Sequence, residues 1–315
     1  MGILQFDARK TYFDSCGTKI EGAQKTEQAI KLAGLDFTVS KHQLYLADGT
    51  IAKNCFANVR DDTNTVLGQV KDRYEILQNN EAFDFMDSLC DQGANFVNAG
   101  CIKDGKKSYI VAETEPMKIL GDEFKPYILF TNSFDGSTGV QAMFTPVRVF
   151  CSNCFVAASK EATNKITIKH SKNVKDRLMI ARDTLLQNTK YLEFLKSRSE
   201  ELAMTKFTQS QFEDLVTDLV PISEIDLAEN KNSAIVARAE DFRNAIMTAY
   251  NQDDLQNYND SVYKAIMAIA DADSHKEPNR NTGNEFYMMK RIMKGMVLLN
   301  VAAQLISRRI NARVF

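Results

Sequence analysis

The pattern of apolar and polar positions along the chain changes near residue 170. Before that point, short runs of alternating or apolar residues are separated by polar turn signals, which is typical of β-hairpins. After it, apolar residues recur at intervals of three and four positions, which indicates amphipathic helices. The pattern predicts an α+β fold: an antiparallel, hairpin-rich sheet with short helices over residues 1–170, then an all-helical domain with a long heptad-patterned helix over residues 171–315.

The first part contains eight short runs that favour strands. They cover residues 37–40, 43–46, 55–60, 66–70, 96–102, 108–113, 127–132 and 140–145. The turns expected between them are Asp48-Gly49 and residues 61–65, 103–106 and 135–137. Two helices interrupt the strands: residues 26–33, capped by Thr26 and stopped by Gly34, and residues 81–90, capped by Asn80.

The second part is predicted as five helices. The first begins at Val174 and would run for about 30 residues, or about 45 Å, with Asn188 and Ser199 in its apolar seam. The others are expected at residues 208–220, stopped by Pro221, and at residues 233–250, 258–271 and 284–312. We interpret their apolar stripes as surfaces for packing within the chain rather than as an oligomeric coiled coil.

Charge changes the picture more than composition does. The chain has 315 residues with 39 basic and 41 acidic side chains, so a net charge of −2 excludes a uniformly basic nucleic-acid binder. The charges are nevertheless segregated. Residues 159–182 carry seven basic and two acidic side chains, residues 199–285 carry seven and 17, and residues 286–315 carry six and none. This segregation is consistent with an electrostatic footprint on one face or with solvated helix faces.

The sequence offers little for catalysis or for a cofactor. Cys151 and Cys154 form a C-x2-C pair, but the other half of a zinc site is missing, and no phosphate-binding glycine loop occurs. The paired carboxylates Asp61/Asp62 and Asp84/Asp87 could hold Mg²⁺, although a turn tip and an exposed helix face explain them more simply. We expect no metal and no cofactor, and we assign no catalytic residue.

Neither a leader nor a membrane span is apparent. The N-terminus lacks an apolar segment, and no run of about 18 apolar residues occurs. We expect a cytoplasmic protein with reduced cysteines and no membrane partner, in the host cytoplasm if a phage encodes it.

The segment from Tyr127 to Lys169 is the most unusual of the chain and has the chemistry of a nucleic-acid site. Arg148 stands on an apolar strand, where its charge must meet solvent, a ligand anion or a carboxylate such as Asp135. Tyr74, Tyr109 and Tyr127 could stack on bases of a single strand. The candidate nucleic-acid-binding residues are Tyr127, Asn132, Arg148, Asn153, Lys169, His170, Lys172, Lys175 and Arg177.

Several blocks between about residues 25 and 185 resemble one family. They are KTEQAIKLAGLDFTV (25–39), RDDTNTVLGQVKDRYEILQN (60–79), EAFDFMDSL (81–89), residues 99–105, PYILFTNSFDGS (126–137), TPVRVFCSN (145–153) and ITIKHSKNVKDRLMIA (166–181). The chain resembles the phage/plasmid-like protein family known as domain of unknown function 932. Two positions depart from its usual pattern: Phe134 replaces a His, and Cys154 replaces a Thr. The resemblance implies a phage or mobile-element origin and no established activity.

These observations favour a non-catalytic protein of phage DNA metabolism that binds single-stranded DNA and oligomerises. The order of hairpin sheet and helices is similar to that of single-strand annealing proteins of phage recombination, which assemble into rings or filaments; this is an analogy of fold only. Two alternatives stay open. One is a Mg²⁺-dependent nucleic-acid-processing enzyme, and the other is a structural or host-interaction scaffold that uses its helical half as the interface.

Overall fold

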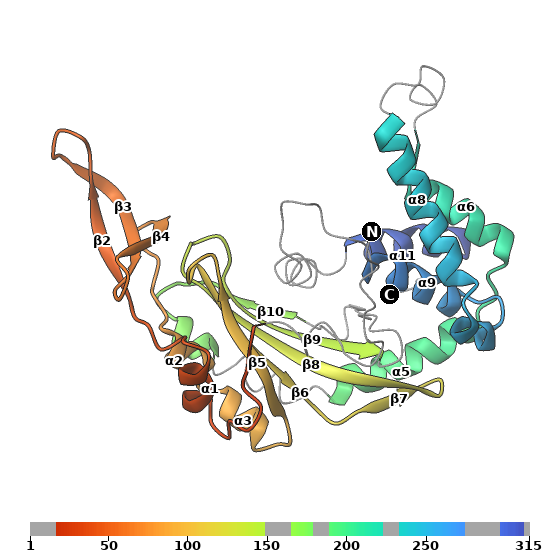
Figure 1. The fold of residues 1–315 in the computed structure, drawn as a ribbon, viewed down its shortest axis with the longest axis horizontal. Coiled ribbons are helices and arrows are strands. Elements are labelled where there is room, and N and C mark those ends of the chain that lie inside the picture. The colour runs from red at the N-terminus through yellow and green to blue at the C-terminus, as the bar shows by residue number, and fades with distance from the viewer. Residues whose placement is uncertain (1–16, 149–164, 179–188, 223–232, 275–296, 312–315) are drawn as a thin grey trace, which may run out of the picture.

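The fold is α+β, with antiparallel sheets and short helices followed by a helical region (Figure 1). The computed structural model describes residues 17–148, 165–178, 189–222, 233–274 and 297–311. Within these residues a large sheet occupies the middle of the molecule, a small sheet projects from one end of it, and the helical region lies at the other end (Figure 1). The α+β class predicted from the sequence is therefore confirmed.

The large sheet is built from sequential hairpins. Its strand order is β1-β5-β6-β8-β9-β10, with β7 paired to β8, and every pair is antiparallel. The strands are β1 (Thr18–Lys19), β5 (Asn95–Ile102), β6 (Lys107–Glu113), β7 (Met117–Ile119), β8 (Asp122–Ser133), β9 (Val140–Arg148) and β10 (Lys165–Ile168). The hairpins expected from the sequence are confirmed, whereas β1, β7 and β10 were too short to produce a clear alternating pattern.

The small sheet, which we call the β-arm, comprises residues 39–70. Its strands are β2 (Val39–Tyr45), β3 (Ile51–Arg60) and β4 (Thr65–Val70), in sequential order. The Asp48-Gly49 turn is confirmed: Gly49 has a φ of 82°, and the amide of Leu46 donates to the carbonyl of Thr50 over 2.7 Å. The expected break at residues 41–42 is absent, because Lys41 and His42 pair with Asn58 and Ala57 of β3. Strand β3 begins at Ile51, four residues before the run expected at 55–60.

The short helices differ in detail from the prediction. Helix α1 (Thr26–Leu32) ends as expected before Gly34, which has a φ of 63°. Thr26 is not its cap, because the carboxylate of Asp87 accepts hydrogen bonds from both the amide and the hydroxyl of Thr26 at 2.6 Å. The amide of Thr26 has no hydrogen-bond partner within α1, and Asp87, from another helix, accepts its hydrogen bond.

The helix expected at residues 81–90 is two helices. They are α2 (Asn79–Phe83), which begins after Gln78 rather than after Asn80, and α3 (Met86–Cys90). At their junction the amides of Asp87 and Ser88 donate to carbonyls three residues earlier, which tightens the turn. The apolar face is as expected, since Phe83, Met86 and Leu89 are buried.

The described helices of the second part are α5 (Thr189–Met204), α6 (Gln209–Leu219), α8 (Ser233–Tyr250), α9 (Val262–Ser274) and α11 (Val297–Arg309). The predicted helix start at Thr208 is confirmed: Thr208 caps α6, and its hydroxyl accepts from the amide of Gln211. The helix expected at 258–271 starts later, because residues 253–258 form a 3₁₀ helix and the hydroxyl of Ser261 accepts from the amide of Lys264. Residues 174–178 are also helical, and α5 covers the later part of the helix predicted to run about 30 residues from Val174; residues 179–188 lie outside the described residues.

Two apolar clusters lie on the two faces of the large sheet. One contains Tyr127 and Leu129 of β8 together with α5, α6, α8, α9 and α11. The other contains Ile128 and Phe130 of β8 together with α1, α2, α3 and Val174. The alternation along β8 explains this division, because successive side chains point to opposite faces. The predicted packing of the helical stripes within the chain is confirmed for the described residues; the boundary proposed at residue 170 stays a prediction.

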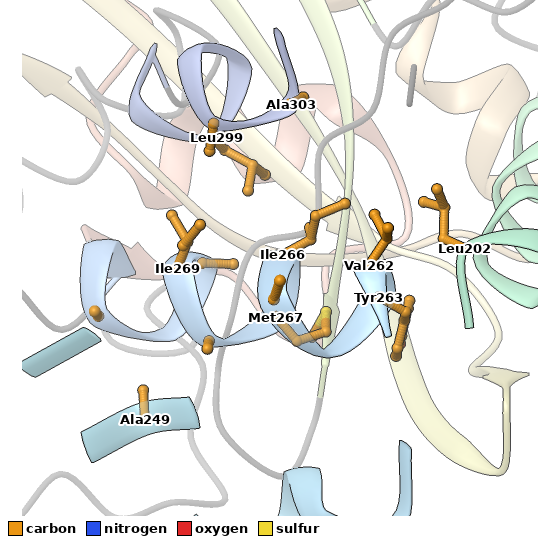
Figure 2. Packing of buried hydrophobic residues seen from close by; sticks show 14 of the residues in the cluster. Leu202, Ala249, Val262, Tyr263, Ile266, Met267, Ile269, Leu299 and Ala303 are labelled. Carbon is orange, nitrogen blue, oxygen red and sulfur yellow. The ribbon is translucent and has the colours of Figure 1, made fainter. Parts of the chain in front are cut away.

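Helix α9 lies at the centre of the helical core. Every residue from Ser261 to Ala270 is buried. Figure 2 shows Ile266 and Ile269 of α9 among Leu299 and Ala303 of α11 and Ala249 of α8. A helix that is enclosed on all sides is expected to be largely apolar, and residues 262–270 of α9 are apolar except for Lys264. The buried ammonium of Lys264 lies 4.2 Å from the centre of the Tyr250 ring.

The attachment of the β-arm to the large sheet depends on Gly68. A Cβ atom at this position would lie 2.6 Å from the Cα of Asp135, which belongs to the turn after β8. We expect Gly68→Ala to lower the free energy of unfolding by about 1–3 kcal/mol, since backbone must move to admit the methyl group. Urea denaturation measures this loss. The neighbouring exposed residue gives the control, Gln69→Ala; equal midpoints for both variants would contradict the attachment.

Candidate nucleic-acid interface

Two turns that are distant in sequence lie side by side at the foot of the β-arm. The first turn follows β4, where the amide of Tyr74 donates to the carbonyl of Lys71 over 3.0 Å. The second follows β10, where the amide of Val174 donates to the carbonyl of Ser171 over 2.7 Å. The rings of Tyr74 and His170 stack between them, with centroids 4.7 Å apart and an interplanar angle of 21°.

Backbone hydrogen bonds add to this contact. The amide of Glu75 donates to the carbonyl of His170 over 3.4 Å, and Nδ1 of His170 lies 3.1 Å from the carbonyl oxygen of Glu75. The hydroxyl of Tyr74 donates to the carbonyl of Ser133 over 2.5 Å. The ammonium of Lys41 donates to the carbonyls of Asp72 and Tyr74, at 2.7 and 2.9 Å. The first turn is thus held by the β-arm, by β8 and by the second turn.

Four cations converge on these turns: Lys71, Arg73, Lys169 and Lys172, which we call the basic junction. All four are exposed, and within the described part of the chain none of them forms an ion pair. Unneutralised cations grouped on a rigid support attract anions such as the phosphates of a nucleic acid. Asp72 and Glu75 are also exposed here, so the local excess of positive charge is smaller than four.

Lys175 has a different environment from the basic junction. Its ammonium lies 2.5 Å from a carboxylate oxygen of Glu81. It lies on the wall of a groove of about 910 Å³ between α1, α2, α3 and residues 174–178, where Glu27, Asp84 and Asp87 supply further negative charge. The charge of Lys175 is therefore paired in this structure. Arg177 is exposed and forms no ion pair with a described residue.

Burial removes three predicted residues from direct contact with a ligand. Tyr127 and Asn132 have no exposed surface, and His170 is 8% exposed. Asn132 supports the fold instead, because its amide nitrogen donates to the carbonyl of Leu77 over 2.8 Å. The same correction applies to Tyr109, which is 5% exposed. Tyr109, Tyr127 and Asn132 are buried because β6 and β8 are covered on both faces. His170 lies in the turn after β10, where the ring of Tyr74 stacks on it.

The register of the large sheet separates Arg148 from the other candidates. Arg148 pairs with Phe124 at the start of β8, whereas Asp135 follows the end of that strand. At about 3.3 Å per residue the two positions are roughly 30 Å apart, so the predicted alternative of an Arg148–Asp135 pair is wrong. The same register places Lys169 beyond Val140, at the opposite end of β9 from Arg148. The side chain of Arg148, and the whole of Asn153, lie outside the description.

Asp135 has its own partners. Its Oδ1 accepts hydrogen bonds from the hydroxyl of Ser133 at 2.6 Å and from the amide of Ser137 at 2.9 Å. Burial raises the pKa of Asp135, but the hydrogen bonds from Ser133 and Ser137 outweigh this effect and leave the pKa below its usual value. The ionised carboxylate closes the turn between β8 and β9.

The paired carboxylates also have local roles. Asp62 pairs with Arg60, Asp61 accepts from the hydroxyl of Thr38 over 2.6 Å, and Asp87 holds Thr26. Among the residues that the structure describes, no group of three His, Cys, Asp or Glu side chains could hold a metal ion. Cys151 and Cys154 lie outside the described residues. The description therefore contains no counterpart of the Mg²⁺ site considered from sequence.

Sequence reasoning missed two residues of the basic junction. Lys71 and Arg73 stand on either side of Asp72, directly after β4, in a block that resembles the family. Two cations in a polar loop that follows a strand are a weak signal by themselves. What gives these cations significance is the neighbouring turn at 169–172, which is almost a hundred residues away in the chain.

Comparison with known proteins defines a family but no activity. The chain matches the family model "Domain of unknown function (DUF932)" over residues 66–293, which is most of its length. The protein belongs to the DUF932 family. No curated protein and no solved structure matches the chain. In the described part, no helix has the length and apolar character required to cross a bilayer.

His170 should make the basic junction sensitive to acid. Burial lowers the pKa of His170, and the hydrogen bond to the Glu75 carbonyl only partly offsets this. The pKa of His170 is lower in the fold than the ordinary value of about 6.5, so folding favours the neutral imidazole. The contribution of this neutral ring to folding stability is complete above about pH 6.5 and is lost as the pH falls below it. We expect the denaturant concentration at the unfolding midpoint to decrease when the pH is lowered from 7.5 to 5.5. The decrease should be smaller in His170→Phe, which retains a ring against Tyr74. Equal pH dependence of both proteins would contradict this assignment.

Proposed function

We propose that the protein is a non-catalytic, single-stranded nucleic-acid-binding protein of phage or mobile-element DNA metabolism. The observation that carries the proposal is the basic junction, in which two turns fixed by the Tyr74–His170 stack present four exposed cations. Phosphate contacts of this kind give affinity without sequence preference. Lys169 and Lys172 come from the candidates chosen on sequence, and Lys71 and Arg73 are added by the fold.

Oligomerisation and strand annealing belong to the same proposal. The support for them is the segregation of charge, with 17 acidic side chains in residues 199–285 and an excess of basic side chains in residues 159–182 and 286–315. Surfaces of opposite charge on one chain allow copies to associate. Light scattering at micromolar concentration tests this part, and a monomer with and without a short single strand would exclude it.

The phosphate contacts can be counted by the dependence of binding on salt. Each phosphate contact with a single strand contributes about −0.7 to the slope of log K against log salt concentration. We expect replacement of Lys71, Arg73, Lys169 and Lys172 by Ala to weaken binding of an oligothymidylate and to reduce the slope by about 3. Fluorescence anisotropy between about 25 and 200 mM salt measures both quantities.

A matched control removes cations from elsewhere on the surface. Lys118 of β7 and Lys206 are exposed and lie outside the basic junction. We expect their replacement by Ala to leave the slope nearly unchanged, and circular dichroism establishes that both variants are folded. Equal slopes for the junction variant and the wild-type protein, or no binding by the wild type at low salt, would refute the proposal.

The enzymatic alternative makes a different prediction. If binding needs only cations of the protein, then EDTA should leave the affinity unchanged, and the oligonucleotide should stay intact in Mg²⁺. Cleavage that requires Mg²⁺ and disappears in Asp135→Ala would instead favour a nucleic-acid-processing enzyme. Gel electrophoresis of a labelled strand separates the two outcomes.

A further inference from the structure

The tip of the β-arm exposes three large apolar side chains. Tyr45, Leu46 and Ile51 are 60%, 57% and 54% exposed, and Tyr45 pairs with Ile51 across the β2–β3 hairpin. They belong to neither apolar cluster of the protein. Figure 1 shows this end of the arm projecting away from the rest of the described chain. An exposed apolar group on a projecting hairpin contributes nothing to a core and is typical of a contact surface.

The tip is continuous with the basic junction. Lys41 lies on the same strand as Tyr45, and its ammonium touches the turn of Lys71 and Arg73 through the carbonyls of Asp72 and Tyr74. The four steps along the strand from Lys41 to Tyr45 span about 13 Å. Lys53, near the tip on β3, is exposed and has no ion-pair partner among the described residues. A bound strand that leaves the junction along the arm would therefore meet Tyr45.

The size of the tip decides between two kinds of occupant. A stable contact between two protein copies buries about 800 Å² on each partner. Complete burial of a large aromatic side chain provides roughly 150–250 Å², so three side chains that are already partly covered fall well short of this area. One flat ring beside two aliphatic groups, with a cation nearby, is sufficient to hold one or two unpaired bases.

We infer that Tyr45 is a base-stacking residue, with Leu46 and Ile51 flanking the stacked base. The inference rests on the proposed function and deepens it, because it names the part of the ligand that the arm contacts: an unpaired base rather than a phosphate. It also predicts a preference for single strands, since the base faces of a duplex are already stacked. The role assigned on sequence to Tyr74, Tyr109 and Tyr127 passes to a tyrosine that solvent reaches.

The absence of tryptophan from the chain allows a direct test. Because the sequence contains no Trp, Tyr45→Trp introduces a unique tryptophan fluorophore at the arm tip. We expect its emission to be quenched when an oligothymidylate binds and to change little with a duplex of equal length. Leu32→Trp gives the control, since Leu32 is 59% exposed on α1 and lies outside the arm.

Affinity measurements separate stacking from charge. Base–aromatic stacking is worth about 1–3 kcal/mol per base, so we expect Tyr45→Ala to weaken oligothymidylate binding by roughly 5- to 150-fold. Tyr45→Phe should restore most of the affinity, because the ring is retained. The salt slope should stay at the wild-type value in both variants, since stacking releases no counterions.

The outcomes distinguish the inference from the proposal on which it rests. If the wild-type protein does not bind at low salt, both fail. A second outcome is that the wild type binds and the junction variant shows a reduced salt slope. If, in that case, Tyr45→Ala binds like the wild type and the emission of Tyr45→Trp is not quenched, only the inference fails. If Tyr45→Ala changes the particle mass and not the affinity for the strand, the tip contacts another copy of the chain and the inference is overturned.

Discussion

The turn between β8 and β9 is the attachment point on which the candidate site depends. The carbonyl of Ser133 accepts a hydrogen bond from the hydroxyl of Tyr74, and the carbonyl of Phe134 accepts one from the side-chain amide of Asn58. The large sheet therefore holds both the foot and the middle of the β-arm. The close approach of Gly68 to Asp135 completes the contact. Because these acceptors are backbone atoms in a closed turn, they fix the arm through geometry rather than through a large apolar interface.

This attachment gives the basic junction its form. A phosphate contact needs cations that are exposed but whose backbone is already ordered, because ordering them on binding would cost conformational entropy. Lys71 and Arg73 satisfy this condition, since the neighbouring Tyr74 is held by Ser133 and by the ring of His170. The buried residues chosen from sequence, such as His170, thus support the surface that the cations present.

The elements predicted correctly are those whose causes are local. The Asp48-Gly49 turn, the stop at Gly34 and the helix start at Thr208 follow from residues within a few positions of one another, and the structure confirms all three. The predictions that were wrong involve distant partners. Thr26 is bonded by Asp87 rather than acting as a cap, and β2 continues through Lys41 and His42, which lack a strand pattern, because both pair with β3.

The sequence by itself determined the α+β class, the principal hairpins, most of the helix positions and membership in a family, because periodicity and turn chemistry act over short distances. The tertiary structure decided which candidates share a surface. It placed Arg148 about 30 Å from Asp135, buried Tyr127, and brought the turn that carries Lys71 against the turn that follows Lys169. Strand register and the packing of one turn on another depend on contacts between residues that are distant along the chain, and no local pattern encodes them.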